Sequence, residues 1–182
     1  KYTYGYSKHS FPFSPSFSNK RFFYSTPNRG DIIVFKTPSD NRTDYIKRLI
    51  GLPGDEIEFI DGNLYINNNQ VLKTKNKNKV PIYCGNQKIN TQYFIEKLPG
   101  GFKHGVVYNN NGSYQNSDKF FIPKDHFFFL GDNRDCSKDS RFLSSVGYVH
   151  KRNLVGKAQF IFFSSNSRLG SIFKFWKWNE IL

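Results

Sequence analysis

The sequence predicts a mainly β fold, and three observations point to it. Short runs rich in β-branched and aromatic residues recur along the 182 residues, with Gly, Pro, Asn and Asp between them. The chain holds 20 Phe and 11 Tyr, residue types that favour strands. No helical pattern of apolar residues continues for more than three turns. A chain of this length can bury a core of its own.

The first part of the chain predicts a β-meander. Leu52–Asp55 fits a type II turn, because Pro suits its second position and Gly accepts the positive φ of its third. Asp61-Gly62 is a two-residue hairpin signal, and Asn68-Asn69 marks a second turn. The strands expected around these turns are Asp31–Lys36, Tyr45–Ile50, Glu56–Ile60, Asn63–Asn67 and Gln70–Lys73.

The composition changes between residues 74 and 118, where Lys, Asn and Gly accumulate. We interpret residues 74–118 as an inserted β subregion with long loops, and residues 1–73 and 119–182 as the core of the same domain, 1–182. The strands expected in these parts are Tyr93–Leu98, Val106–Tyr108, Lys119–Ile122, His126–Leu130, Val146–Val149 and Leu154–Phe163.

The net charge and the residue counts limit the classes of protein to which this chain can belong. The net charge of +13 suggests an anionic partner or surface, or else a solvated basic exterior. Cys84 and Cys136 are too few for a disulfide scaffold; the sequence allows one bridge between them, but we expect two free thiols. No apolar run exceeds four residues, whereas a membrane span needs about 20. Met is absent even at position 1, so we expect this chain to be a fragment.

One strand carries a lysine among apolar neighbours. Side chains alternate between the two faces of a strand, so Tyr45, Lys47 and Leu49 share one face. Desolvation disfavours the ammonium form and lowers the pKa, which lets a lysine act as a general base near neutral pH. The pattern alone also fits a lysine at a sheet edge whose amine reaches water.

One loop gathers charged and hydroxyl side chains. Residues 130–141 hold three carboxylates, two arginines and two serines directly after the apolar strand His126–Leu130. Loops that a rigid strand positions often carry function. On its own, this loop also fits a solvated turn with surface ion pairs, and its spacing does not match the EF-hand pattern.

Together, the two segments resemble the lysine box and the GDNRxxSxDSR box of bacterial type I signal peptidases, the serine–lysine proteases that remove signal peptides from exported proteins. Three further stretches agree with this family, in the same order along the chain. They are Tyr4–Ser7 with Ser10–Phe13, Arg29–Phe35 and Asn153–Ala158. The resemblance covers nearly the whole chain, and it implies the coiled antiparallel sheets of the signal peptidase catalytic core.

The resemblance implies a catalytic pair of Lys47 as general base and Ser137 as the hydroxyl that orients its amine. It implies supporting ion pairs in which Asp132 binds Arg48 and Asp139 binds Arg141. The substrate-binding residues that it implies are Asp44, Tyr45 and Ile46, which would line a groove that takes the substrate as an added strand.

The chain departs from the family pattern at the nucleophile. The family's serine lies in a Ser-Met-x-Pro box upstream of the stretch that begins this chain, and the chain has no Met. Ser10, Ser14 and Ser16 align beyond that box, and we do not assign the role to any of them. We therefore expect the chain to carry the base but not the nucleophilic serine, and to be inactive by itself.

The resemblance also implies partners and a location. The partners are signal peptides of secretory preproteins and the membrane surface, with no nucleic acid, and neither a cofactor nor a metal is expected. The location is the bacterial inner membrane, with the catalytic domain on the extracytoplasmic, periplasmic side. The aromatic and basic tail Ile172–Trp178 suits the interface of a bilayer, or else packs onto the β core.

Another class of function remains open from the residues. A basic, aromatic, mainly β chain also suits a protein that binds single-stranded nucleic acid, with bases stacked on Tyr and Phe. Such a protein spaces its aromatic side chains along an exposed sheet face. Phe127, Phe128 and Phe129 instead form a continuous apolar run that is typical of a core.

Overall fold

The computed structural model confirms a mainly β fold built from antiparallel strands. It describes residues 4, 25–77, 82–84, 87–109, 115–158, 160–161 and 176–177. In these parts, the one helical segment is a short 3-10 turn, η2 (Lys151–Asn153), and no helix is long and apolar enough to cross a bilayer. The expected tail segment Ile172–Trp178 and the opening match apart from Tyr4 lie outside the described residues, except that Trp176 and Lys177 form a short strand.

A five-stranded sheet runs in the order β13-β12-β2-β1-β14. Its strands are β1 (Ile32–Lys36), β2 (Asp44–Gly51), β12 (His126–Leu130), β13 (Val149–His150) and β14 (Leu154–Lys157). A second sheet runs in the order β11-β3-β4-β5. Its strands are β3 (Glu56–Ile60), β4 (Asn63–Ile66), β5 (Asn69–Gln70) and β11 (Phe120–Phe121).

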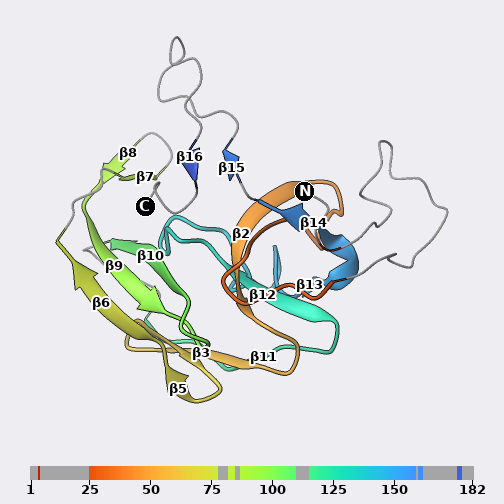
Figure 1. Ribbon diagram of the computed structural model, residues 1–182, viewed down its shortest axis with the longest axis horizontal. Coiled ribbons are helices and arrows are strands. Elements are labelled where there is room, and N and C mark those ends of the chain that lie inside the picture. The colour runs from red at the N-terminus through yellow and green to blue at the C-terminus, as the bar shows by residue number, and fades with distance from the viewer. Residues whose placement is uncertain are drawn as a thin grey trace, which may run out of the picture.

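A third sheet has the order β10-β9-β6 and lies to one side of the other two (Figure 1). Its strands are β6 (Leu72–Asn76), β9 (Thr91–Lys97) and β10 (Lys103–Asn109). Two further pairs of short strands form two-stranded antiparallel sheets. They are β7 (Ile82–Cys84) with β8 (Gln87–Ile89), and β15 (Phe160–Ile161) with β16 (Trp176–Lys177).

The predicted turns form, but one of them lies one residue earlier in the chain than expected. Gly54 has φ +88° and Asp55 N–H bonds to Leu52 O at 3.0 Å, as the type II turn requires. The second hairpin turn was expected at Asn68-Asn69, but the positive φ values fall on Asn67 and Asn68. Asn tolerates this conformation at either place, and the pairing of Ile66 with Asn69 decides between them.

Several strand boundaries differ from expectation. The predicted strand Gln70–Lys73 is split at Val71, which is buried and bonds to Leu64 O, so the chain then crosses to the third sheet. Only the end of Val146–Val149 is a strand, because Val146 and Gly147 N–H bond back to Phe142 O in tight turns.

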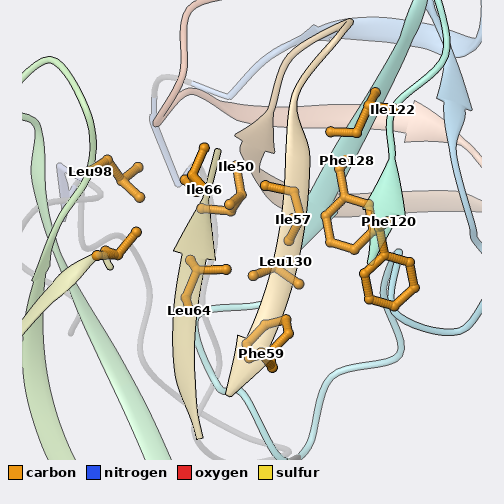
Figure 2. Packing of buried hydrophobic residues seen from close by; sticks show 11 residues of the cluster. Ile50, Ile57, Phe59, Leu64, Ile66, Leu98, Phe120, Ile122, Phe128 and Leu130 are labelled. Atoms are coloured by element: carbon orange, nitrogen blue, oxygen red, sulfur yellow. The ribbon is translucent and has the colours of Figure 1, made fainter. Parts of the chain in front are cut away.

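Two apolar clusters form the core. One lies between β3, β4, β11 and the end of β12, where Phe120, Phe128 and Ile57 pack together (Figure 2). The other includes Phe35, Leu49 and other side chains of β1, β2, β12, β13 and β14. Strand β2 contributes to both, because Leu49 and Ile50 point to opposite faces.

Candidate active site

Lys47 lies on β2, between β12 and β1 in the order of the five-stranded sheet, and pairs with Ile33 of β1. Of its neighbours on the same face, Leu49 belongs to the core cluster of that sheet and Tyr45 packs against the cluster. The side chain of Lys47 is half-buried, with its amine 5.7 Å from the centre of the Tyr45 ring. The expected apolar surroundings of the lysine are therefore present.

The amine of Lys47 donates a hydrogen bond to the hydroxyl of Ser137, with 2.9 Å between Nζ and Oγ. The two residues are 90 positions apart, and Ser137 is buried. The structure thus brings together the two residues that the resemblance pairs.

Burial lowers the pKa of Lys47 from its ordinary value of 10.5. The charges of Asp139 and Asp132 oppose this shift, and the charge of Arg141 adds to it. The net lowering favours the neutral amine, which has a lone pair that can accept a proton.

Gly131 leaves the space that this contact needs. A Cβ at position 131 would lie 2.0 Å from Ser137 Oγ and 3.5 Å from Lys47 Nζ. Any larger residue would therefore push Ser137 away from the lysine. The Gly131 N–H donates to Asp139 Oδ2 at 3.0 Å, which fixes the first residue of the loop.

Both expected ion pairs are formed. Arg48 donates to the two Asp132 oxygens at 2.8 and 2.6 Å and to Gly30 O at 2.8 Å, so it joins the lysine strand to the loop. Arg141 Nε lies 2.8 Å from Asp139 Oδ1, and Asp139 is fully buried. One ion pair thus holds the loop before Ser137 in the sequence, and the other holds it after Ser137.

The expected substrate-binding residues lie at the start of β2. Asp44 is exposed and pairs with Lys36, Tyr45 is half-buried, and Ile46 is 43% exposed. Strand β12 pairs with β2 only from Arg48 to Gly51. Among the described strands, residues 44–47 of β2 therefore pair on the β1 side alone, and their other edge is open.

A second polar cluster, which the sequence did not predict, joins the third sheet to the loop after β12. Arg134 donates to Glu96 and to Tyr108, and all three side chains are buried. His104 lies beside them, with Nε2 3.7 Å from Glu96 Oε2 and 4.0 Å from Asp132 Oδ1. Only Arg134 belongs to a motif, and no local pattern marks the other three.

The two cysteines are not free thiols, contrary to expectation. Cys84 and Cys136 form a disulfide with 5.6 Å between their Cα atoms. They are 52 residues apart in sequence, and the fold brings the end of β7 beside the loop that carries Ser137. Sequence spacing could not reveal this approach.

The aromatic run of β12 belongs to the core. Phe127, Phe128 and Phe129 are each no more than 1% exposed. The interpretation as core side chains is confirmed, and these rings cannot stack on bases.

Comparisons with known proteins give one consistent result. A family model described as "Signal peptidase, peptidase S26" matches residues 2–163. Signal peptidase I of Rickettsia conorii is 45% identical over 177 residues, covering 91% of this chain and 63% of that protein. Signal peptidase I of Rickettsia typhi is 45% identical over 175 residues, covering 91% and 64%. The chain thus spans less than two thirds of the length of these curated relatives.

Among solved structures, a signal peptidase I from Enterococcus faecalis V583 is 27% identical, with a TM-score of 0.43. The match covers 74% of this chain and 97% of that one.

Proposed function

The chain belongs to the peptidase S26 family of signal peptidases, and on that premise we propose that it is the catalytic part of an endopeptidase that removes signal peptides from exported preproteins with a serine–lysine pair. The observation that carries the proposal is the contact of the half-buried Lys47 amine with Ser137. A lysine with a lowered pKa can do general-base work that an exposed lysine cannot.

In the proposed mechanism, neutral Lys47 accepts the proton of the nucleophilic serine as its oxygen attacks the scissile carbonyl. The lysine then returns the proton to the leaving amine, and it activates water in the same way for deacylation. Ser137 fixes the direction of the Lys47 amine, and the Asp139–Arg141 and Asp132–Arg48 pairs hold Ser137 in its loop.

We propose that the nucleophilic serine lies outside these 182 residues. The hydroxyl that Lys47 contacts in the described part of the chain belongs to Ser137, which the family resemblance assigns to support. The relatives are longer than this chain, so they have room for a further segment.

The substrate would bind as an extra strand along the open edge of β2. Residues Asp44, Tyr45 and Ile46 lie at that edge, directly before Lys47. A strand added there makes main-chain hydrogen bonds and brings its side chains to pockets along the groove. This arrangement would deliver an extended signal-peptide segment, with small residues one and three before the cut, to the lysine.

The proposal extends to location and organisation. Because signal peptides anchor preproteins in the inner membrane, the domain would act on its periplasmic side, close to the lipid surface. Residues 1–73 and 119–182 would form the catalytic core, and residues 74–118 the inserted subregion. The pairing of β11 with β3, across that insertion, supports this division.

The test replaces Lys47 in the intact protein, meaning these residues together with the segment that carries the proposed nucleophile. Lys47→Ala should lower cleavage of a preprotein by about 10²- to 10⁴-fold, the range for loss of a general base. Lys124→Ala removes an exposed lysine and serves as the matched control. Cleavage by Lys47→Ala within a few-fold of the control would overturn the proposal.

A further inference from the structure

The loop that carries Ser137 rests on a buried arginine. Arg134 is 1% exposed, and its two terminal nitrogens bond to the two oxygens of Glu96 at 3.0 and 2.5 Å. Tyr108 donates to Glu96 at 2.9 Å and accepts from Arg134 at 3.0 Å. Glu96 and Tyr108 belong to β9 and β10 of the third sheet, so the loop is bound to the inserted subregion.

The contacts continue from Arg134 to the catalytic pair. The backbone oxygen of Arg134 accepts a hydrogen bond from Arg141, which also binds both oxygens of Asp139. Asp139 in turn accepts from the N–H of Gly131, the residue whose missing side chain admits Ser137. The position of Arg134 therefore bears on where Ser137 can lie.

The backbone of the loop is attached to the same sheet. Val107 N–H donates to Asp132 O and Val107 O accepts from Arg134 N–H, each at 2.9 Å. The disulfide of Cys136 adds a covalent tie directly before Ser137. The subregion thus holds the loop at Asp132, Arg134 and Cys136, through backbone hydrogen bonds, an ion pair and a disulfide.

A buried ion pair is weak grounds for stability, because taking both charges out of water offsets their attraction. It does fix geometry, because a planar guanidinium and a carboxylate meet in only a few orientations. The Glu96–Arg134 pair is better explained by placement of the loop than by a gain in stability.

We propose that Glu96 is a positioning residue for the catalytic lysine. It holds Arg134 and through it the loop, so that Ser137 Oγ stays within hydrogen-bond distance of Lys47 Nζ and water stays away from the amine. Glu96 contacts no reacting group itself. The inference rests on the proposed function, since it assigns Lys47 the role of base.

The test measures the pH profile of kcat/KM for Glu96→Gln in the intact protein. A displaced loop hydrates Lys47, which brings its pKa back towards the ordinary value, so the acid limb of the profile should move to higher pH. At pH 7, kcat should fall by about 10- to 100-fold with little change in KM, because the edge of β2 is untouched. Glu58→Gln, the same change on β3, is the control.

The outcomes separate a positioning role from a structural one. Partial unfolding lowers the amount of active enzyme and leaves the acid limb where it was, so an unshifted limb in Glu96→Gln would overturn the inference. If Glu96→Gln does not fold, Tyr108→Phe removes only the hydroxyl that joins Glu96 to Arg134. It should shift the limb in the same direction by less, with Tyr65→Phe on β4 as its control.

A different result would contradict the proposed function. If Lys47→Ala cleaves normally, Lys47 is not the base, whatever Glu96 does. If Lys47→Ala is inactive and neither Glu96→Gln nor Tyr108→Phe moves the limb, only the positioning inference is overturned.

Discussion

The chemistry of Lys47 depends on a few side chains around its amine. Burial against the core of the five-stranded sheet lowers its pKa, and Ser137 supplies the one polar contact described for the amine. Gly131 makes room for that hydroxyl. The missing side chain of Gly131 is therefore as necessary for the Lys47–Ser137 contact as the Ser137 hydroxyl itself.

Gly131→Ala should separate Ser137 from Lys47, because the new Cβ would occupy the place of the hydroxyl. We expect cleavage by the intact protein to fall about 100-fold, the loss typical of a misplacement near 1 Å. The new Cβ would also lie 2.3 Å from Ser137 Cβ, so Gly131→Ala should cost at least as much as Ser137→Ala, which removes only the hydroxyl. A kcat/KM for Gly131→Ala within a few-fold of the wild type would show that the position of Ser137 does not depend on Gly131.

His104 should make the fold sensitive to acid. Burial, with the charges of Arg48 and Arg134, lowers the pKa of His104 from 6.5 to about 2. The unfolded chain therefore binds a proton below pH 6.5 that the folded chain does not, and stability falls as the pH falls. Between pH 7 and 5 this group alone should lower the free energy of unfolding by about 2 kcal/mol.

Urea unfolding of the wild type and His104→Leu at both pH values measures this term. The wild type should lose about 2 kcal/mol more than the variant on going from pH 7 to 5. Equal losses would mean that His104 is protonated in the folded protein.

Single residues also show the limit of prediction from sequence. The contact between Lys47 and Ser137 was predictable from the family motifs that carry them, whereas β alternation alone also fitted a lysine whose amine reaches water. Glu96 was not predictable, because its partner Arg134 lies 38 residues away and nothing in the strand Thr91–Lys97 marks one carboxylate as buried.

At the scale of elements, the site is built where β2 loses one neighbour. Strand β12 leaves β2 after Arg48, and the loop that follows β12 returns to place Ser137 beside Lys47. The alternating strand Glu56–Ile60 and the continuous apolar strand His126–Leu130 were predicted with correct bounds. Val146–Val149 was not, because turn hydrogen bonds to Phe142 take precedence over its β-branched residues.

The disulfide joins two elements that sequence does not connect, β7 and the Ser137 loop. Its reduction should lower the free energy of unfolding by about 2–4 kcal/mol, since the unfolded chain regains the freedom of the closed loop. Urea unfolding with and without a reductant measures the effect, and Cys84→Ser, which has no disulfide to break, should not respond to the reductant. Alkylation of both cysteines in the unreduced folded protein would contradict the disulfide.

At the scale of the whole molecule, the dominant property is the net charge of +13. Part of it gathers on the third sheet, where four lysines line a hollow of about 600 Å³ that has no acidic residue in its lining. They are Lys75, Lys77, Lys97 and Lys103. An anionic lipid surface attracts such a cluster by about 1 kcal/mol for each lysine that comes near it.

We therefore expect the chain to co-sediment with vesicles that contain phosphatidylglycerol at low salt, and less at high salt because exposed charges are screened. Vesicles of phosphatidylcholine alone are the control. Replacing the four lysines by Gln should weaken binding at low salt, and deleting residues 171–182 should weaken the binding that persists at high salt. Failure to sediment with anionic vesicles at low salt would contradict a membrane-facing basic surface.

We propose that Lys47 acts as the base because burial lowers the pKa of its amine. The most direct measurement is NMR titration of the Lys47 amine in isotope-labelled chain, with its signal assigned from a Lys47→Arg variant and the urea-unfolded chain as reference. We expect a midpoint for folded Lys47 below that of the unfolded chain, because burial disfavours the charged amine. The same midpoint in the folded and unfolded chain would contradict it.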